Sequence, residues 1–395
     1  MKRCLQYIVL AALLVAVPLL CCICAGYDDM LADVAAFPPR CDDWIGLPER
    51  LWEVKCPFNW YAFVGMSVCV VLSVLPFLRR VVGAMRSQRG PVNGADRHAL
   101  PMFGWIGLGV MVAGWVLSWT RLECFASFQR YSYIPLWAGF ILLVNALCVK
   151  RCGRSPLTSA TRAYLWSFPA SSLFWWFFEY LNRYVWNWFY IGVRDISPLE
   201  YVVFATVCFA SVLPGVTAVA WLLGSFGMFA DEAYCGMAKV NIRSRTSVAV
   251  MSFLSAVGLT GIVFFPQFAY PLLWISPLMV FVLVQVLMKE RSALDALADG
   301  NWAVVFRFAV AALICGVVWE TWNYYSLAKW VYTIPWVHRW KIWEMPLLGF
   351  AGYLPFGVEC VVVAAWIDPR LTGGRVTSAV RSTTATEGWQ YEIWG

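Results

Sequence analysis

Long apolar runs dominate the sequence and decide what the chain can fold into. Each is roughly 20 residues long and is separated from the next by a short polar or charged segment. A helical run of this length matches the hydrocarbon core of a bilayer, since about 20 residues at 1.5 Å each span about 30 Å. We therefore predict an all-α, polytopic integral membrane bundle of about ten transmembrane helices, over residues 4–26, 59–78, 101–120, 133–149, 163–182, 199–224, 248–265, 272–288, 302–320 and 345–367.

The overall composition agrees with a membrane protein. Hydrophobic residues make up 61% and charged residues 13% of the chain, whereas soluble domains average roughly 45–50% and about 25%. The net charge of +7 would suit nucleic acid, but in a membrane chain it is typical of basic cytoplasmic loops. No nucleic-acid partner is therefore expected.

The distribution of basic residues predicts the orientation. Counted from the N-terminus, alternate loops hold 19 Lys and Arg, against 10 in the loops between them. Because cytoplasmic loops are enriched in Lys and Arg, both termini are placed in the cytoplasm if the first helix is not cleaved. The predicted location is the plasma (inner) membrane, with several passes.

The N-terminal segments and the tail complete this organisation. Residues 1–26 are either a signal anchor or a signal peptide, and the length of the run favours an uncleaved helix. Residues 27–58 form an acidic external loop, and 59–100 the second helix with a basic cytoplasmic loop. Residues 371–395 form a polar cytoplasmic tail that is predicted to be flexible.

Two cysteines, Cys41 and Cys56, lie in the external loop. An oxidising compartment would permit a disulfide between them, and the alternative is a pair of separate thiols. Both interpretations stay open on the sequence.

An internal repeat organises the rest of the chain. Glu179-x-x-Asn182 and Trp188-x-Tyr190 recur as Glu320-x-x-Asn323 and Trp330-x-Tyr332, at offsets of 141 and 142 residues. The ordered matches predict a tandem repeat of two four-helix units, 101–247 and 248–370. An even number of helices gives both copies the same orientation, so the matching segments should meet near a common axis.

Acidic side chains in the repeat are the candidate catalytic groups. Glu179 and Glu320 precede Asn182 and Asn323 by three residues, so that each pair shares one helix face. The predicted helices place these carboxylates near the external face, together with the acids that begin the returning helices, Glu200 and Glu344. Acids inside a membrane commonly transfer protons, with the asparagines orienting them. The alternative is that each carboxylate bonds its Asn, a Trp N–H or the backbone and only orders the bundle.

Tryptophan is concentrated around these acids. Ten of the 24 tryptophans lie in 175–188 and 319–343. Either they form an interfacial belt, or they wall a pocket for a flat lipophilic ligand or a cation. In the second case the candidate substrate-binding residues are Trp188, Tyr190, Trp330 and Tyr332.

Two charges lie deeper than the others, Arg307 and Glu359. Counted along antiparallel helices, their depths differ by only about 5 Å. Because an unpaired charge is costly at such depth, we predict a structural ion pair between them.

No metal or cofactor motif is present. The two histidines fall in loops of opposite polarity, which excludes bis-histidine haem within one bundle. The chain also has no CxxCH, HExxH or GxxxxGK[ST] sequence. We therefore expect no cofactor and no metal site.

One resemblance bears on function. In each unit an acid is followed by Trp-x-Tyr, then by a Glu that opens the next helix, preceded in the first unit by Pro-Leu, and then by a helix proline. This order resembles the membrane-embedded lycopene cyclase domain over about 35–40 residues per unit. The matching residues are Pro198-Leu199-Glu200, Phe204 and Pro214 in the first copy and Glu344, Phe350 and Pro355 in the second. The resemblance implies an acid-catalysed reaction on an isoprenoid, through a carbocation held by aromatic faces and carboxylates. Glu200 would match the first acid of the family's Pro-Leu-Glu-Glu motif. Tyr201 stands where the second acid would be, and Met345 follows Glu344, so the acid pair is incomplete.

The expected function follows from these features. It is the binding or chemical conversion of a lipophilic substrate, either a membrane lipid or an isoprenoid, by intramembrane carboxylates near the external face. One alternative is a lipid or small-molecule transporter or flippase, which the helix breakers Pro214-Gly215 and Pro355-x-Gly357 favour. Another is a non-catalytic membrane subunit, with a membrane protein partner or as a homo-oligomer.

Overall fold

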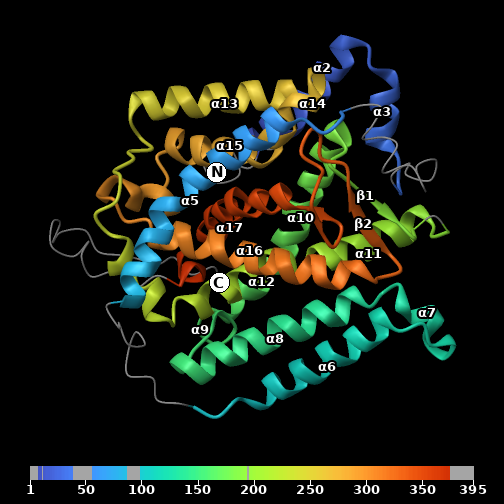
Figure 1. Cartoon of the computed structure of the whole chain (residues 1–395), viewed down its shortest axis with the longest axis vertical. Helices are drawn as coiled ribbons and strands as arrows, with labels where there is room; N and C mark the ends of the chain where they lie inside the picture. The colour runs from blue at the N-terminus through green and yellow to red at the C-terminus, as the bar shows by residue number, and fades with distance from the viewer. Residues whose placement is uncertain (1–7, 11, 39–55, 87–97, 194, 374–395) are drawn as a thin grey trace.

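The structure is a computed structural model, and it describes residues 8–10, 12–38, 56–86, 98–193 and 195–373. Over these residues the chain is mostly helical, and Figure 1 shows the long helices side by side in a bundle. The choice between a Cys41–Cys56 disulfide and two separate thiols depends on Cys41, which lies outside the described residues, as does the predicted tail from residue 374 onward.

The helices and strands follow the apolar runs of the sequence. The helices are α2 (Val17–Ala25), α3 (Asp28–Ala35), α5 (Trp60–Arg86), α6 (Met102–Trp119), α7 (Ala126–Gln129), α8 (Tyr133–Cys152), α9 (Pro156–Ser159), α10 (Thr161–Val185), α11 (Pro198–Phe209), α12 (Val212–Leu223), α13 (Arg245–Phe264), α14 (Pro266–Ala269), α15 (Ser276–Leu287), α16 (Ala303–Tyr324) and α17 (Tyr353–Ile367). The strands are β1 (Trp188–Ile191), β2 (Lys329–Tyr332), β3 (Lys341–Ile342) and β4 (Met345–Pro346), with β1 paired to β2 and β3 to β4.

Among the described residues, eight helical segments are long and apolar enough to cross a membrane. A ninth is counted if Pro266–Trp274 and Ser276–Leu287, which meet at a bend of 49°, form one broken span. The multi-pass helical class is thus confirmed, but ten spans are not. The predicted span at 163–182 is helical as part of α10, but its Trp, Tyr and Ser side chains keep it outside this set.

The core lies where α10, α12, α16 and α17 pack together, with α16 and α17 near the centre of Figure 1. Close approach of α16 and α17 depends on Gly357. A Cβ added there would lie 2.3 Å from the carbonyl oxygen of Phe308. Small residues let membrane helices approach closely, so Gly357 sets the spacing of the central pair.

The predicted span 199–224 is broken into α11 and α12 at Ala210 and Ser211. Ser171 of α10 bridges the break: its hydroxyl donates to the carbonyl of Phe209 (2.6 Å) and accepts from the amide of Leu213 (2.9 Å). Pro214 lies in the first turn of α12, where a missing N–H costs no helical hydrogen bond. The break therefore leaves few backbone groups without a partner.

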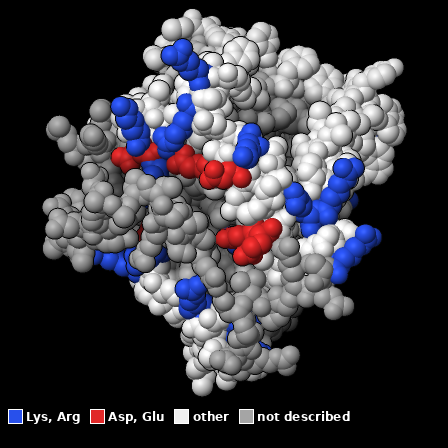
Figure 2. Space-filling model, turned by 90° about the vertical axis from the view of Figure 1, so that its left-hand side faces the viewer, with Lys and Arg blue, Asp and Glu red and all other residues white. Residues whose placement is uncertain are grey.

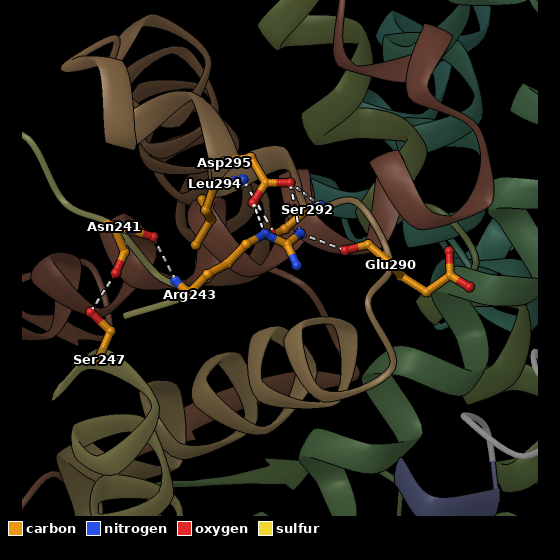
Figure 3. A network of polar contacts seen from close by, with 7 residues as sticks. All are labelled: Asn241, Arg243, Ser247, Glu290, Ser292, Leu294 and Asp295. Atoms are coloured by element: carbon orange, nitrogen blue, oxygen red, sulfur yellow. Dashed lines mark hydrogen bonds and ion pairs between the residues drawn. The ribbon is translucent and has the colours of Figure 1, made fainter. Parts of the chain in front are cut away.

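The loops on the left-hand side of Figure 1 form a face with many basic side chains. Figure 2 shows Lys and Arg spread over this face, with Asp and Glu gathered between them. Arg243 joins two of the loops (Figure 3), since its guanidinium donates to Asp295 at 2.9 Å through both Nε and Nη2. Nη2 also donates to the carbonyl of Glu290 (2.6 Å). One side chain thus links the start of α13 to the segment that follows α15.

We expect Arg243→Ala to lower the free energy of unfolding by about 1 kcal/mol, because a bidentate ion pair and a backbone hydrogen bond are lost at a partly exposed site. Arg245→Ala, at the start of α13, is the matched control and should have a smaller effect. Thermal unfolding in detergent checks both variants. Equal losses would show that Arg243 does not hold the two loops together.

Candidate aromatic cavity with two buried carboxylates

The two Trp-x-Tyr segments pair with each other as the strands β1 and β2, on the right-hand side of Figure 1. The pairing is antiparallel, with Trp188 opposite Tyr332 and Tyr190 opposite Trp330. Directly opposed residues and residues two apart share one face of a ribbon. All four aromatic side chains therefore lie on the same face, and all four line the same cavity.

Glu179 of α10 lies behind the first pair of aromatic residues. Its side chain is buried, and its Oε1 accepts three hydrogen bonds. Two come from indole N–H groups, Trp175 at 3.0 Å and Trp188 at 2.9 Å, and one from the hydroxyl of Tyr190 at 2.6 Å. Three aromatic donors thus converge on one carboxylate oxygen.

Glu320 of α16 repeats the arrangement with the second pair. Its Oε1 accepts from the indole of Trp330 (3.3 Å) and from the hydroxyls of Tyr332 (2.5 Å) and Tyr353 (2.9 Å). Its other oxygen, Oε2, is buried and has no hydrogen-bond partner among the described residues. Glu320 therefore has one saturated oxygen and one available acceptor.

The third donor is supplied differently in the two halves. The residue 141 positions after Trp175 is Gly316, and a Cβ there would lie 2.4 Å from the ring of Tyr353. The ring of Tyr353, from α17, thus takes the space beside Gly316 and brings its hydroxyl to Glu320. The residue 141 positions before Tyr353 is Val212, which has no donor.

The two asparagines hold the strands rather than the carboxylates. Asn182 donates to the carbonyl of Trp188 (2.6 Å) and accepts from the amides of Asn187 and Trp188. Asn323 donates to the carbonyl of Trp330 (2.7 Å) and accepts from its amide (2.9 Å). The expected contact between each Asn and its Glu is replaced by a clamp on the backbone, which places each indole within reach of the carboxylate.

The cavity in front of these groups has a volume of about 120 Å³. None of its described lining residues is charged, and twelve of the twenty are aromatic. The aromatic ones are Tyr133, Trp175, Trp188, Tyr190, Tyr201, Phe204, Phe209, Trp274, Trp319, Trp330, Tyr332 and Tyr353.

Glu200 and Glu344 do not join this arrangement. Glu200, in the first turn of α11, accepts a hydrogen bond from the hydroxyl of Tyr131. Glu344 forms an ion pair with Lys329 at 2.5 Å. Because Glu200 and Glu344 have these other partners, only Glu179 and Glu320 of the expected group of four carboxylates lie behind the cavity wall.

The predicted ion pair between Arg307 and Glu359 is wrong. Arg307 instead binds Asp231, with 2.8 Å between Nη1 and Oδ1. Glu359 is fully buried, and neither of its carboxylate oxygens has a hydrogen-bond partner among the described residues. The two side chains have similar depths along their helices, but depth does not determine the direction in which a side chain points around the helix axis.

Sequence reasoning missed several lining residues, above all Tyr353, Trp274 and Trp319. Trp319 directly precedes Glu320 and is one of the ten clustered tryptophans, so it carried a signal. Tyr353 carried none, because the residue 141 positions before it is a valine.

Fold and site together define a multi-pass helical membrane protein with an aromatic cavity and two buried carboxylates. No protein-family model matches the sequence, and neither do the curated proteins or the solved structures with which it was compared. Inference about function therefore rests on the residues of the site.

Proposed function

We propose that the protein binds the end group of a lipophilic molecule, lipid-like or isoprenoid-like, in the aromatic cavity. Glu179 and Glu320 would polarise the aromatic wall or exchange a proton with the bound group. The observation that carries the proposal is the convergence of three aromatic donors on each of two buried carboxylates, with donors from both sets lining one cavity.

The size of the cavity limits what enters it. A dry cavity of about 150 Å³ in another protein holds one benzene molecule, and the volume here is about 120 Å³. A whole lipid or carotenoid does not fit, so the cavity would take only the end of a longer molecule.

The helix α11 supports access from the bilayer. Its outward side chains Leu199, Val203 and Val207 are exposed and apolar, while others on the same helix, Tyr201 and Ala205, line the cavity. The buried residues of α11 also pack in a small cluster that is separate from the main core. A short helix that is only locally packed is a suitable wall through which a membrane molecule could reach the cavity.

If the protein is an enzyme, Glu320 is the group that we propose exchanges a proton with the bound molecule. Intramembrane acids commonly carry protons, and a general acid must lie within hydrogen-bond reach of the group that it protonates. Glu320 is buried behind the wall and does not line the cavity itself, so a proton would pass between it and the bound group through the hydroxyl of Tyr332 or Tyr353, since both residues bind Glu320 and line the cavity. The resemblance to the lycopene cyclase domain supports an isoprenoid, although the second acid of that family's motif is missing.

The tandem repeat and the orientation in the membrane are part of the same proposal. A two-fold axis through the ribbon would exchange the pair Trp188–Tyr332 with the pair Trp330–Tyr190, as expected for two repeated units that share one site. The basic face of Figure 2 supports a cytoplasmic position for those loops in an inner membrane.

Transport of a lipid or small molecule is the second candidate function. The bent pair Pro266–Trp274 and Ser276–Leu287 and the break between α11 and α12 favour it, because transporters commonly use discontinuous helices at their binding sites. Movement of a fluorescent lipid between the leaflets of proteoliposomes would distinguish transport from binding alone.

Filling the cavity tests the proposal. Ala205→Phe places a ring into the cavity from α11, and we expect it to remove most of the lipophilic compound that copurifies with the native protein, as measured by mass spectrometry of organic extracts. Val203→Phe, on the exposed side of the same helix, is the matched control and should retain the compound. Equal amounts in the two variants would place the binding site elsewhere.

A further inference from the structure

We propose that the aromatic cavity is a cation cage, and that the end group it binds is a quaternary or fully alkylated ammonium group. This inference rests on the proposed function, in which the cavity takes the end of a longer molecule, and it adds the charge of that end group.

Six hydrogen-bond donors of the cavity wall are already used by the two carboxylates. The polar atoms of Trp175, Trp188 and Tyr190 donate to Glu179, and those of Trp330, Tyr332 and Tyr353 to Glu320. The indole N–H of Trp319, another lining residue, has no hydrogen-bond partner among the described residues, but the six donors beside the carboxylates are not available to a phosphate, carboxylate or sugar. The wall instead offers aromatic faces, which suits a ligand that carries charge but makes no hydrogen bonds of its own.

The charge around the cavity is mostly negative. Two carboxylates lie directly behind the wall, and no ion pair joins either of them to a Lys or Arg in the part of the chain that the structure describes. Arg183 follows Glu179 by one helical turn, but its guanidinium lies over the rings of Phe37 and Trp186 at 5.5 and 5.9 Å. Arg183 still acts on Glu179 electrostatically, so a bound cation would above all supply positive charge beside Glu320.

The aromatic rings of the wall can attract a cation. A cation within about 6 Å of a ring centroid is attracted by the negative face of the ring, and aromatic cages recognise quaternary ammonium groups in this way. Donation of an O–H or N–H to a carboxylate leaves the ring more electron-rich, which strengthens the attraction. Rings in the wall also support one another, since Trp188 stacks on Trp274 with centroids 5.6 Å apart.

The volume agrees with such an occupant. A trimethylammonium group is a compact body of about the size of benzene, which occupies a cavity of about 150 Å³ in another protein, and the space here is about 120 Å³. A trimethylammonium head would therefore fit, while its chain continued towards α11.

Binding of a matched pair of ligands tests the cage. Choline and its neutral carbon isostere 3,3-dimethylbutan-1-ol have the same shape but differ in charge, so titrations of the purified full-length protein, followed by calorimetry, separate charge from size. We expect choline to bind at least ten-fold more tightly than the isostere. Equal affinities, or binding of neither ligand, would overturn the cage.

Variants identify the source of the preference. Glu320→Gln should weaken choline binding at least ten-fold and leave the affinity for the isostere within two-fold, because only the charge is removed. Glu123→Gln, the same change at an exposed position, should leave both affinities unchanged. Equal weakening of both ligands by Glu320→Gln would mean a collapsed cavity and would contradict the inference.

Competition distinguishes a lipid head group from a free molecule. If a lipid is the occupant, the lysophosphatidylcholine concentration that displaces half of the bound choline should be at least ten-fold lower than the concentration of unlabelled choline that does the same. A site for a free ammonium compound should show no such difference. Either result supports the cage, and lysophosphatidylglycerol serves as the control. The cage would be overturned if lysophosphatidylglycerol displaced choline as effectively as lysophosphatidylcholine does. In that case the proposed function would still be supported if Ala205→Phe removed a copurified lipid.

Discussion

Replacing Asp231 with alanine is expected to lower the free energy of unfolding by about 2–3 kcal/mol. Arg307 is 4% exposed, the side chain of Asp231 is 29% exposed, and their bond at 2.8 Å is the only ion pair of this guanidinium in the described chain. Removing Asp231 leaves the buried charge of Arg307 without its partner, and the cost stays below that of breaking a fully buried pair because water reaches the site from the side of Asp231. The loss should appear as a lower unfolding midpoint in detergent.

Two further variants separate this effect from a general disturbance of the loop. Glu232→Ala, in the same 3-10 turn as Asp231, should change the midpoint only slightly. Combining Asp231→Ala with Arg307→Met should recover much of the loss, because the second change removes the stranded charge. No recovery in the double variant would show that Asp231 stabilises the loop in another way.

The failed prediction of the Arg307 partner shows what helical counting can and cannot give. Counting residues from helix ends gives depth, and Arg307 and Glu359 do lie on neighbouring helices, α16 and α17. It does not give the direction of a side chain around the axis. Asp231 lies in a 3-10 turn far away in the sequence, and only the tertiary fold brings it beside Arg307.

The meeting of the two Trp-x-Tyr segments could be predicted, because a matched order of acid, asparagine and aromatic residues recurs along the chain. Their strand pairing could not, since two four-residue strands inside an apolar chain give too short a pattern. The same applies to Tyr353, which replaces the donor that Trp175 supplies in the other half. Gly316 leaves room for Tyr353, whose hydroxyl is the third aromatic donor to Glu320 as Trp175 is to Glu179.

The span predictions differ from the structure for a physical reason. Aromatic and serine side chains lower the mean hydropathy of α10, which is also the helix that carries Glu179 and Ser171. They contact the cavity and the break between α11 and α12 rather than lipid alone. A helix that supplies a polar site thus becomes a weak transmembrane signal.

Replacing Glu320 with leucine should be among the most damaging single changes at the cavity. Leucine removes the carboxylate and leaves the hydroxyls of Tyr332 and Tyr353 without the acceptor that they bind in the native protein, whereas the indole of Trp330 keeps its 2.7 Å hydrogen bond to the Tyr332 hydroxyl. Each stranded donor costs about 1–3 kcal/mol, so the two hydroxyls together should lower the free energy of unfolding by at least about 2 kcal/mol. Glu320→Gln keeps an acceptor oxygen and should cost about 1 kcal/mol.

The decisive measurement is a double-mutant cycle with Tyr353→Phe. In the native protein this change removes a hydrogen bond to Glu320 and should destabilise by about 1 kcal/mol. In the Glu320→Leu protein the same change removes a stranded hydroxyl, so it should be neutral or stabilising. That reversal follows only if Glu320 is the acceptor that holds the aromatic wall in place, because a carboxylate that merely fills space would give equal effects of Tyr353→Phe in both backgrounds.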